Sequence, residues 1–184
     1  MKLVIGFGVM VALLAGANEA KSATPDATPV DTAPQHFVCN TGYTLDKCHK
    51  DIAVLRKALD KYPVGQLGEW TWVLVRSSDW RDIKAARGLD PDSPAFSYLA
   101  GKKTFVEEVL VTQVPGRSGL LLTKWGMSME NLLDFAIAHE IGHAMCNEQD
   151  EGKVEQVARL LREKKPAACE VVLQAKRKKG EMRR

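Results

Sequence analysis

Apolar residues recur at helical spacing in three segments of the 184-residue chain. The first, Asp51–Tyr62, has one apolar stripe and ends at a proline and a glycine. The second, Leu132–Met145, is apolar on nearly all sides, which predicts a buried helix, and Ser128 is placed to cap its N-terminus. The third, Glu151–Leu161, is amphipathic, with a single apolar stripe. We therefore expect three helices, of which the second is buried.

Two β-prone runs lie between the first and second predicted helices. Trp70–Arg76 is rich in aromatic and β-branched residues and is the best strand candidate. Lys103–Val111 is the second candidate, and a Pro-Gly pair closes it. Between them, Ser77–Ser97 contains two prolines and is predicted to form turns and loop with one short helix. This order of elements predicts the α+β class, in one domain over residues 36–173, a normal size for a single core.

The chain begins with a segment typical of an export signal. Lys2 precedes an apolar run, Leu3–Ala17, that is too short to span a bilayer comfortably. Small residues at its end fit cleavage before Asn18, and no cysteine follows to carry a bacterial lipid anchor. Residues 1–17 are therefore predicted to be a signal peptide, with an uncleaved anchor as the alternative. The protein is predicted to be secreted or periplasmic, without a stable membrane anchor.

Two further segments lie outside the predicted core. Residues 18–35 are rich in Thr, Ala, Pro and Asp and have almost no large apolar side chains, so they are predicted to be a disordered linker. Residues 174–184 carry six Lys or Arg and one Glu, a net charge of +5. A short basic tail is usually a solvated chain end. Without interleaved aromatic residues it gives no sign of specific nucleic-acid recognition.

The second predicted helix contains His-Glu-Ile-Gly-His at positions 139–143. On a helix, residues four apart share a face, so His139 and His143 can present two imidazole nitrogens to one metal ion. Glu140 is turned about 100° from His139, beside such a metal rather than on it. There its carboxylate can accept a proton from a water whose pKa a zinc ion lowers to about 7. The motif predicts metal-assisted hydrolysis. The alternative, a solvated His-Glu-His group on a surface helix, fits the apolar surroundings poorly.

The third zinc ligand is expected to be a carboxylate. A catalytic zinc usually has three protein ligands and one open position, and no histidine follows His143. On the next helix, Glu151 lies about 70° and Glu155 about 110° from the centre of the apolar stripe, which favours Glu151. Glu155 would then hydrogen-bond the ring nitrogen of a ligand histidine that faces away from the metal. Because the two angles differ by only about 40°, Glu155 remains the alternative ligand. The short interval after His143 requires a tight turn, which Asn147 and Asp150 can support.

This pair of motifs resembles the Glu-zincin metallopeptidases. In several groups of that family, the helix after H-E-x-x-H has the pattern E-x-x-A-D/N-x-x-A, and its first Glu is the metal ligand. The corresponding residues in this chain are Glu151, Val154, Glu155 and Ala158. Val154 stands in place of the usual Ala, and Glu155 in place of Asp or Asn. The resemblance covers about thirty residues, Asn131 to Leu161, and identifies no subfamily.

The resemblance implies a fold and a chemistry. The fold is a minimal zincin-like domain with a small β-sheet, a zinc-bearing helix and a following ligand helix. The chemistry is hydrolysis of a bond in a peptide or protein substrate, with one Zn²⁺ per chain. The implied site consists of the general base Glu140 and three zinc ligands: His139, His143 and Glu151. A sheet edge over the zinc cleft would pair with extended substrate; Thr104–Val111 is the candidate for that edge, with an ordinary interior strand as the alternative.

The sequence leaves two functional points open. A further group should stabilise the oxyanion that develops during peptide hydrolysis, and the candidates are Tyr98, Arg117 and His49. The main alternative to an enzyme is a secreted zinc-stabilised binding module without turnover. Glu140 favours catalysis, because a binding module has no need for a carboxylate at that position. A hydrolase of another amide is a weaker alternative that uses the same chemistry.

The four cysteines are expected to form two disulfides in an oxidising compartment. Of the three possible pairings, we favour Cys39–Cys48 together with Cys146–Cys169. The first pair is close in sequence, and the second would join the helix carrying the zinc motif to the helix that follows. Cysteine zinc ligands are disfavoured because no C-x-x-C spacing is present.

Overall fold

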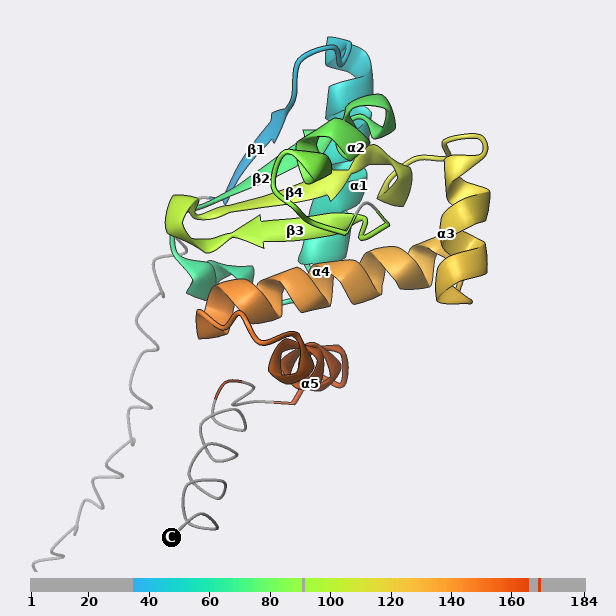
Figure 1. Ribbon diagram of the computed structural model, residues 1–184. Helices are drawn as coiled ribbons and strands as arrows, with labels where there is room; N and C mark the ends of the chain where they lie inside the picture. Colours follow the sequence, from blue (N-terminus) through green and yellow to red (C-terminus); the bar gives the residue numbers. More distant parts are fainter. Residues whose placement is uncertain (1–34, 91, 166–168, 170–184) are drawn as a thin grey trace, which may run out of the picture. The chain divides into compact units, whose positions relative to one another are not determined.

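The computed structural model of the chain describes residues 35–90, 92–165 and 169. These residues form a mixed α and β domain with a small four-stranded sheet (Figure 1). The predicted signal peptide, nearly all of the predicted linker and the basic tail lie outside the described residues. Among the residues that are described, no helix has the length and apolar character needed to cross a bilayer.

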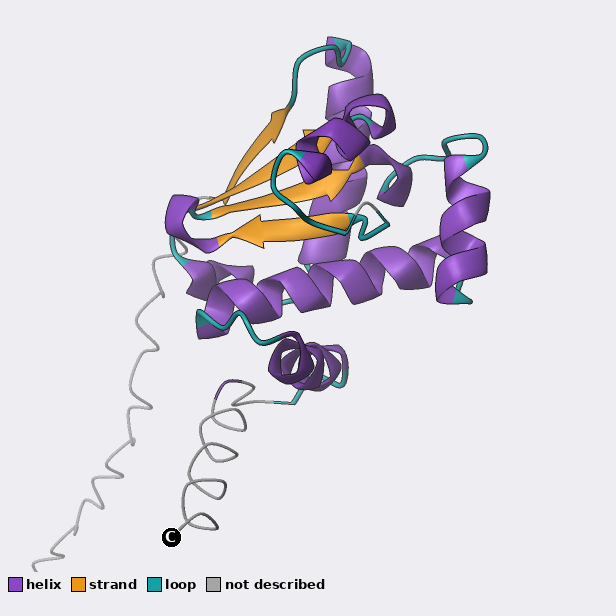
Figure 2. Cartoon of the chain, in the orientation of Figure 1, coloured by secondary structure: helices purple, strands orange, loops and turns teal. Residues whose placement is uncertain are grey.

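Strands and helical elements alternate as far as β4, and the described elements after it are all helical (Figure 2). The described strands are β1 Gln35–Cys39, β2 Trp70–Val75, β3 Ala95–Tyr98 and β4 Lys103–Glu107. The α-helices are α1 Leu45–Leu59, α2 Ser77–Ala85, α3 Arg117–Trp125, α4 Met129–Cys146 and α5 Glu151–Arg162. Short 3-10 turns are η1 Val64–Leu67, η2 Leu99–Gly101 and η3 Glu108–Leu110.

The sheet has the strand order β1-β2-β4-β3. β1 and β4 both pair with β2 in parallel, and β3 pairs with β4 in antiparallel fashion. Among the described strands, β3 is therefore an edge strand that pairs on one side only. The indole nitrogen of Trp70 donates to the Thr104 hydroxyl at 3.0 Å, a contact that ties β2 to β4 within the core.

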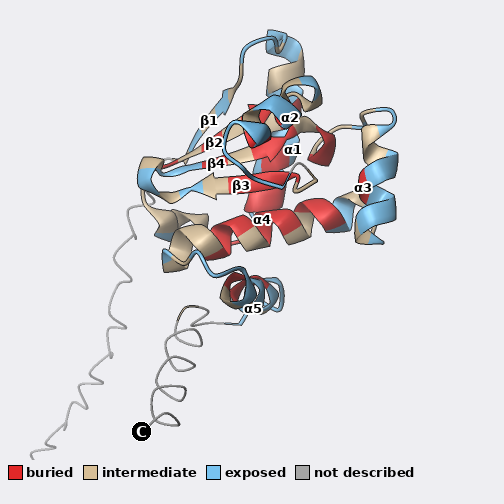
Figure 3. Cartoon of the chain, in the orientation of Figure 1, coloured by how far each residue is buried: buried red, intermediate tan, exposed pale blue. Residues whose placement is uncertain are grey.

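Alternation along β2 builds two hydrophobic layers. Trp70, Trp72 and Leu74 belong to the main core, which they share with α1, α4 and α5. Val75 points to the other face, where it packs with Trp80 of α2 and with Phe96. Because β2 is buried on both faces, its run of apolar residues is nearly continuous, as expected for an interior parallel strand. Figure 3 shows buried residues concentrated in the sheet and along α4.

Helix α4 runs alongside β3 (Figure 1). The predicted cap is confirmed, since the Ser128 hydroxyl accepts from the backbone N–H of Asn131 at 3.3 Å. Helix α5 packs closely on α4 at Gly142, where an added Cβ would meet the Val154 side chain at 3.2 Å and the Val154 carbonyl oxygen at 3.4 Å. A residue without a side chain at 142 thus lets the two helices approach.

Of the two roles considered for Thr104–Val111, the sheet edge is wrong and the interior strand is confirmed. The strand that begins near Thr104 is β4, which lies inside the sheet between β2 and β3, and it ends at Glu107. The edge strand next to α4 is β3, within a segment that the sequence assigned to turns and loop. Its Phe96 and Tyr98 favour a strand, but the segment has only four residues and directly follows a proline, so it is too short for a clear alternating pattern.

Other boundaries differ for local reasons. Helix α1 begins at Leu45 rather than Asp51, because Thr44 caps it and accepts from the backbone N–H of Lys47 at 3.3 Å. The first turns of α1 are mostly polar and carry little apolar stripe to detect. Gln35, assigned to the linker, begins β1 and pairs with Trp70. Helix α3 had no counterpart among the predicted elements.

Both predicted disulfides are confirmed. Cys39–Cys48 joins β1 to the first turn of α1. Cys146–Cys169 joins the end of α4 to the chain beyond α5. Two closed disulfides, with no free cysteine in the described part of the chain, fit an oxidising environment.

Candidate metal centre

Three side chains from α4 and α5 converge on one point. The Nε2 atoms of His139 and His143, one helical turn apart on α4, lie 3.2 Å from each other. One carboxylate oxygen of Glu151, the first residue of α5, lies 2.9 Å from His139 Nε2, and the other lies 3.6 Å from His143 Nε2. Among the described residues these three form a group whose donor atoms could hold a metal ion.

The distances between these donors fit a tetrahedral zinc site. With zinc–ligand bonds of about 2.0–2.1 Å, ligand atoms at tetrahedral angles are about 3.3–3.4 Å apart. The separation of 3.2 Å between the two histidine Nε2 atoms is close to that value. Glu151 approaches His139 with one carboxylate oxygen, at 2.9 Å, and His143 with the other, at 3.6 Å. Two imidazoles and one carboxylate are also a donor set typical of catalytic zinc, with a fourth position left for water or substrate.

The turn after α4 fixes the orientation of His143. Its Nδ1 lies 2.7 Å from the backbone carbonyl oxygen of Glu148, which can only accept, so Nδ1 carries the proton. In the neutral imidazole, Nε2 then presents a lone pair toward His139 and Glu151. Partners of this kind on the far nitrogen are usual for histidines that bind metals, because they set the tautomer and the ring orientation.

The other ring nitrogen of His139 faces Glu155. Its Nδ1 is buried, lies 3.6 Å from a Glu155 carboxylate oxygen, and has no hydrogen bond among the described residues. A small movement of the Glu155 side chain would bring the two within hydrogen-bonding distance. Glu151 therefore lies at the cluster itself, and Glu155 lies behind His139.

A tight turn brings Glu151 to the histidines. Asn147 adopts the left-handed conformation, with φ 44° and ψ 47°, and ends α4. The Glu148 carboxylate accepts from the backbone N–H groups of Gln149 and Asp150, both at 3.1 Å. Asp150 then caps α5 by accepting from the backbone N–H of Lys153 at 3.0 Å. The supporting roles predicted for Asn147 and Asp150 in this turn are confirmed.

Glu140 lies beside the cluster and is almost completely buried, at 4% exposure. One of its carboxylate oxygens has no hydrogen-bond partner among the described residues. Burial raises the pKa of the Glu140 carboxyl above its usual value, and the charge of the nearby His143 opposes that rise. A desolvated carboxyl of raised pKa next to two histidines has the properties of a group that takes up and releases protons.

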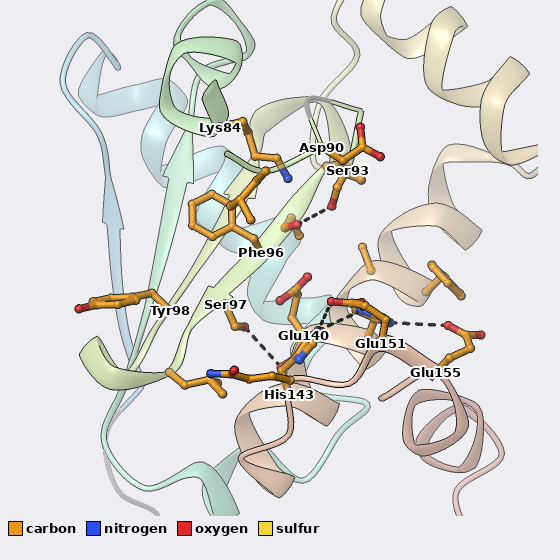
Figure 4. Close-up of a pocket in the computed structure, with 18 of the residues that line it drawn as sticks. Lys84, Asp90, Ser93, Phe96, Ser97, Tyr98, Glu140, His143, Glu151 and Glu155 are labelled. Carbon is orange, nitrogen blue, oxygen red and sulfur yellow. Dashed lines mark hydrogen bonds and ion pairs between the residues drawn. The ribbon is translucent and has the colours of Figure 1, made fainter. Parts of the chain in front are cut away.

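A pocket of about 850 Å³ opens over these residues. Its walls include all of β3, the loop before it, and the faces of α4 and α5 that carry His139, Glu140, His143, Glu151 and Glu155. Figure 4 shows Glu140 near the centre of this pocket, with Ser97 of β3 next to α4. The Ser97 hydroxyl approaches the Glu140 backbone carbonyl at 3.5 Å, which joins the sheet edge to the helix.

The three oxyanion candidates are placed differently. Tyr98 lines the pocket, but its hydroxyl points away from the histidines (Figure 4). Arg117 is outside the pocket lining and donates to the buried Glu107 carboxylate at 2.8 and 2.9 Å. His49 lies on α1 and does not line the pocket. Arg117 and His49 are therefore wrong as oxyanion groups, and Tyr98 would have to change its rotamer to act as one.

Lys84 of α2 is a pocket residue that the sequence did not identify. It is 1% exposed and lines the pocket together with Glu140. Lysine is among the residue types least often buried, so nothing in the local pattern singles it out. Only the packing of α2 against the sheet places it there.

Comparison of the chain with protein-family models finds no match, and comparison with curated proteins finds none either. The resemblance to the Glu-zincins therefore depends on the motif residues and on the geometry of His139, Glu140, His143 and Glu151.

Proposed function

We propose that the protein is a secreted zinc-dependent peptidase with a zincin-like site. The observation that carries this proposal is the convergence of His139, His143 and Glu151 at 2.9–3.6 Å, with the buried carboxylate of Glu140 beside them in a pocket. The arrangement matches the H-E-x-x-H…E pattern residue by residue. The two disulfides and the apolar N-terminal segment support secretion.

Each residue of the candidate site would have its own role in peptide hydrolysis. His139, His143 and Glu151 would hold the zinc, which when bound lowers the pKa of a water and polarises a substrate carbonyl. Glu140 would accept the proton from the attacking water and then deliver it to the leaving amine. The backbone carbonyl of Glu148 keeps the proton of His143 on Nδ1, so that Nε2 remains available as a ligand.

Strand β3 offers a place for the substrate backbone. Of the strands that the structure describes, it pairs with β4 alone, and its residues from Ala95 to Tyr98 line the pocket next to α4. An extended peptide could add to this edge by main-chain hydrogen bonds, which hold a substrate independently of its side chains. The edge role that the resemblance implies thus suits β3 rather than β4.

The burial of Glu140 favours catalysis over the alternative of a zinc-stabilised binding module. A carboxylate at 4% exposure with an unpaired oxygen costs free energy, because water no longer solvates it. In a module that only binds zinc, no function would offset this loss of stability. An enzyme would gain a general base held beside the candidate metal ligands.

Metal depletion and restoration test this proposal. The mature protein, treated with a chelator and dialysed, should lose cleavage of an unbiased peptide library, and about one equivalent of zinc per chain should restore it. The His143→Ala variant, handled in parallel, should regain neither zinc nor cleavage. Full activity in the chelated protein, or zinc bound in a one-to-one ratio by His143→Ala, would contradict the site.

A further inference from the structure

Lys84 is a buried cation with apolar neighbours. It is 1% exposed, and its Nζ lies 5.5 Å from the centre of the Trp80 ring and 5.4 Å from the centre of the Phe96 ring. Burial lowers the pKa of its ammonium, although the charges of Glu140, Asp90 and Glu107 oppose that shift. Removing a lysine ammonium from water is costly, so a buried one normally has an anionic partner.

No such partner contacts Lys84 in the described part of the chain. Its Nζ forms no hydrogen bond or ion pair there, whereas two other cations near the pocket are paired with acids. Arg117 binds the Glu107 carboxylate, and Lys124 lies 3.4 Å from Asp90 and 3.1 Å from Asp92. The aromatic rings offer a weaker, face-on attraction that leaves the ammonium donors unused. Lys84 is thus left with unused hydrogen-bond donors.

The unused donors face the pocket. Figure 4 shows Lys84 entering the pocket from α2, with Glu140 between it and the group formed by His143 and Glu151. Among the described lining residues Lys84 is the one lysine or arginine, and the other charged groups are acids and the two histidines. Glu140 would therefore lie between a group bound at Lys84 and the bond that is cleaved. A substrate side chain or a chain end can reach that position.

We propose that Lys84 recognises a carboxylate of the substrate and so sets its specificity. This proposal rests on the proposed peptidase function. The neighbouring Phe96 ring, which also lines the pocket, gives the subsite an apolar wall, which suits an acidic group on a short aliphatic stem. That carboxylate can be the side chain of an acidic residue or the free C-terminus of a peptide. An ammonium donating to a desolvated carboxylate contributes enough to change kcat/KM by about 10- to 100-fold.

A matched peptide series tests the proposal on the zinc-loaded protein. A peptide that the wild type cleaves is remade with Glu or Gln at each position, and with a C-terminal acid or amide. At one position, or at the terminus, the acidic peptide should have a kcat/KM about 10 to 100 times that of the corresponding neutral peptide. A preference at an internal position identifies a side chain, and one at the terminus identifies the chain end.

Three variants assign the preference to Lys84. The ratio of acidic to neutral substrate should fall close to one in Lys84→Met and be largely kept in Lys84→Arg. It should be unchanged in Lys57→Met, which removes an exposed lysine from α1. A wild type without any preference would overturn the proposal. So would a Lys84→Met variant that loses rate equally on both substrates, since Lys84 would then act only through Glu140.

A binding measurement separates this proposal from the peptidase function. The NMR signal of the Trp80 indole N–H, next to Lys84, is followed in zinc-loaded protein during titration with small probes. N-acetylglutamate α-amide presents only a side-chain carboxylate, N-acetylglutamine only a terminal one, and N-acetylglutamine amide neither. One of the acids should shift the signal in wild type and not in Lys84→Met, even if no peptide is cleaved. Equal shifts in both proteins, or none in wild type, would overturn the carboxylate site.

Discussion

The Nδ1 atom of His143 lies 2.7 Å from the backbone carbonyl oxygen of Glu148. This contact joins a residue of the candidate metal centre to the turn that delivers Glu151. The turn therefore has two effects on the centre, since it orients one histidine and places the carboxylate. Changes in the turn should affect zinc binding even where they touch none of the three candidate ligands.

Asn147 tests that dependence. It has a left-handed backbone with φ 44°, a conformation that costs an alanine about 1–2 kcal/mol and a glycine almost nothing. Asn147→Ala should lower the free energy of unfolding by about 1 kcal/mol and weaken zinc binding, whereas Asn147→Gly should change both much less. Denaturant titration and competition with a zinc chelator measure the two quantities. Equal behaviour of the two variants would show that the turn conformation does not matter.

The glutamates of α5 should differ in their effect on zinc. Glu151 has oxygens at 2.9 and 3.6 Å from the two Nε2 atoms, while Glu155 faces only the far nitrogen of His139. Glu155→Gln should weaken zinc binding by about 10- to 100-fold, as expected for a partner that orients a ligand. Glu151→Gln should weaken it much further, because a charged donor is lost from the metal. Competitive chelator titration of both variants decides, and the reverse order would make Glu155 the ligand.

Asp134 links the helices that carry the candidate centre. On α4 its carboxylate accepts from the Tyr62 hydroxyl at 2.8 Å and from Arg162 Nε of α5 at 3.1 Å. Burial alone would raise the pKa of Asp134, but hydrogen bonds from Tyr62, Lys61 and Arg162 outweigh it and hold the pKa below its usual value. Its stabilising contribution is thus present above the unfolded pKa of about 3.9 and is lost as pH falls through the lower folded pKa.

Asp134→Asn should therefore destabilise the protein at neutral pH by about 1–2 kcal/mol. Its difference from wild type should shrink below about pH 5 and disappear under more acidic conditions. Denaturant titrations at several pH values measure this. Asp46→Asn is the matched control, because it removes an exposed carboxylate paired with Lys50 on α1, and such pairs contribute little. A pH-independent loss in Asp134→Asn would show that the carboxylate charge is not the cause.

The local parts of the site could be predicted from the sequence. His139, Glu140 and His143 follow from the helical repeat, and the structure places them as that repeat requires. Glu151 is also at the predicted place, because of its position directly after the turn and not because of the helical wheel. Its side chain is 75% exposed, so it is not turned toward the apolar stripe. It reaches the histidines because it is the first residue after the turn.

The missing parts depend on contacts between distant segments. Whether β3 or β4 forms the sheet edge is decided by how the strands pair with one another, and neither segment shows this by itself. Arg117 was a plausible oxyanion group until its partner Glu107, buried at the end of β4, was known. Lys84 enters the pocket only because Trp80 of the same helix, α2, packs against the sheet. None of these placements leaves a periodic signal in the chain.

Cleavage by Glu140→Gln tests the central claim most directly. The amide keeps the size of the carboxylate but cannot accept the proton of the attacking water. Wild type and Glu140→Gln, matched for zinc content by elemental analysis, are compared on the same peptide library. The account predicts equal zinc and a loss of about 100-fold or more in kcat/KM for the variant. Cleavage near the wild-type rate by zinc-loaded Glu140→Gln, or no cleavage by zinc-loaded wild type, would contradict it.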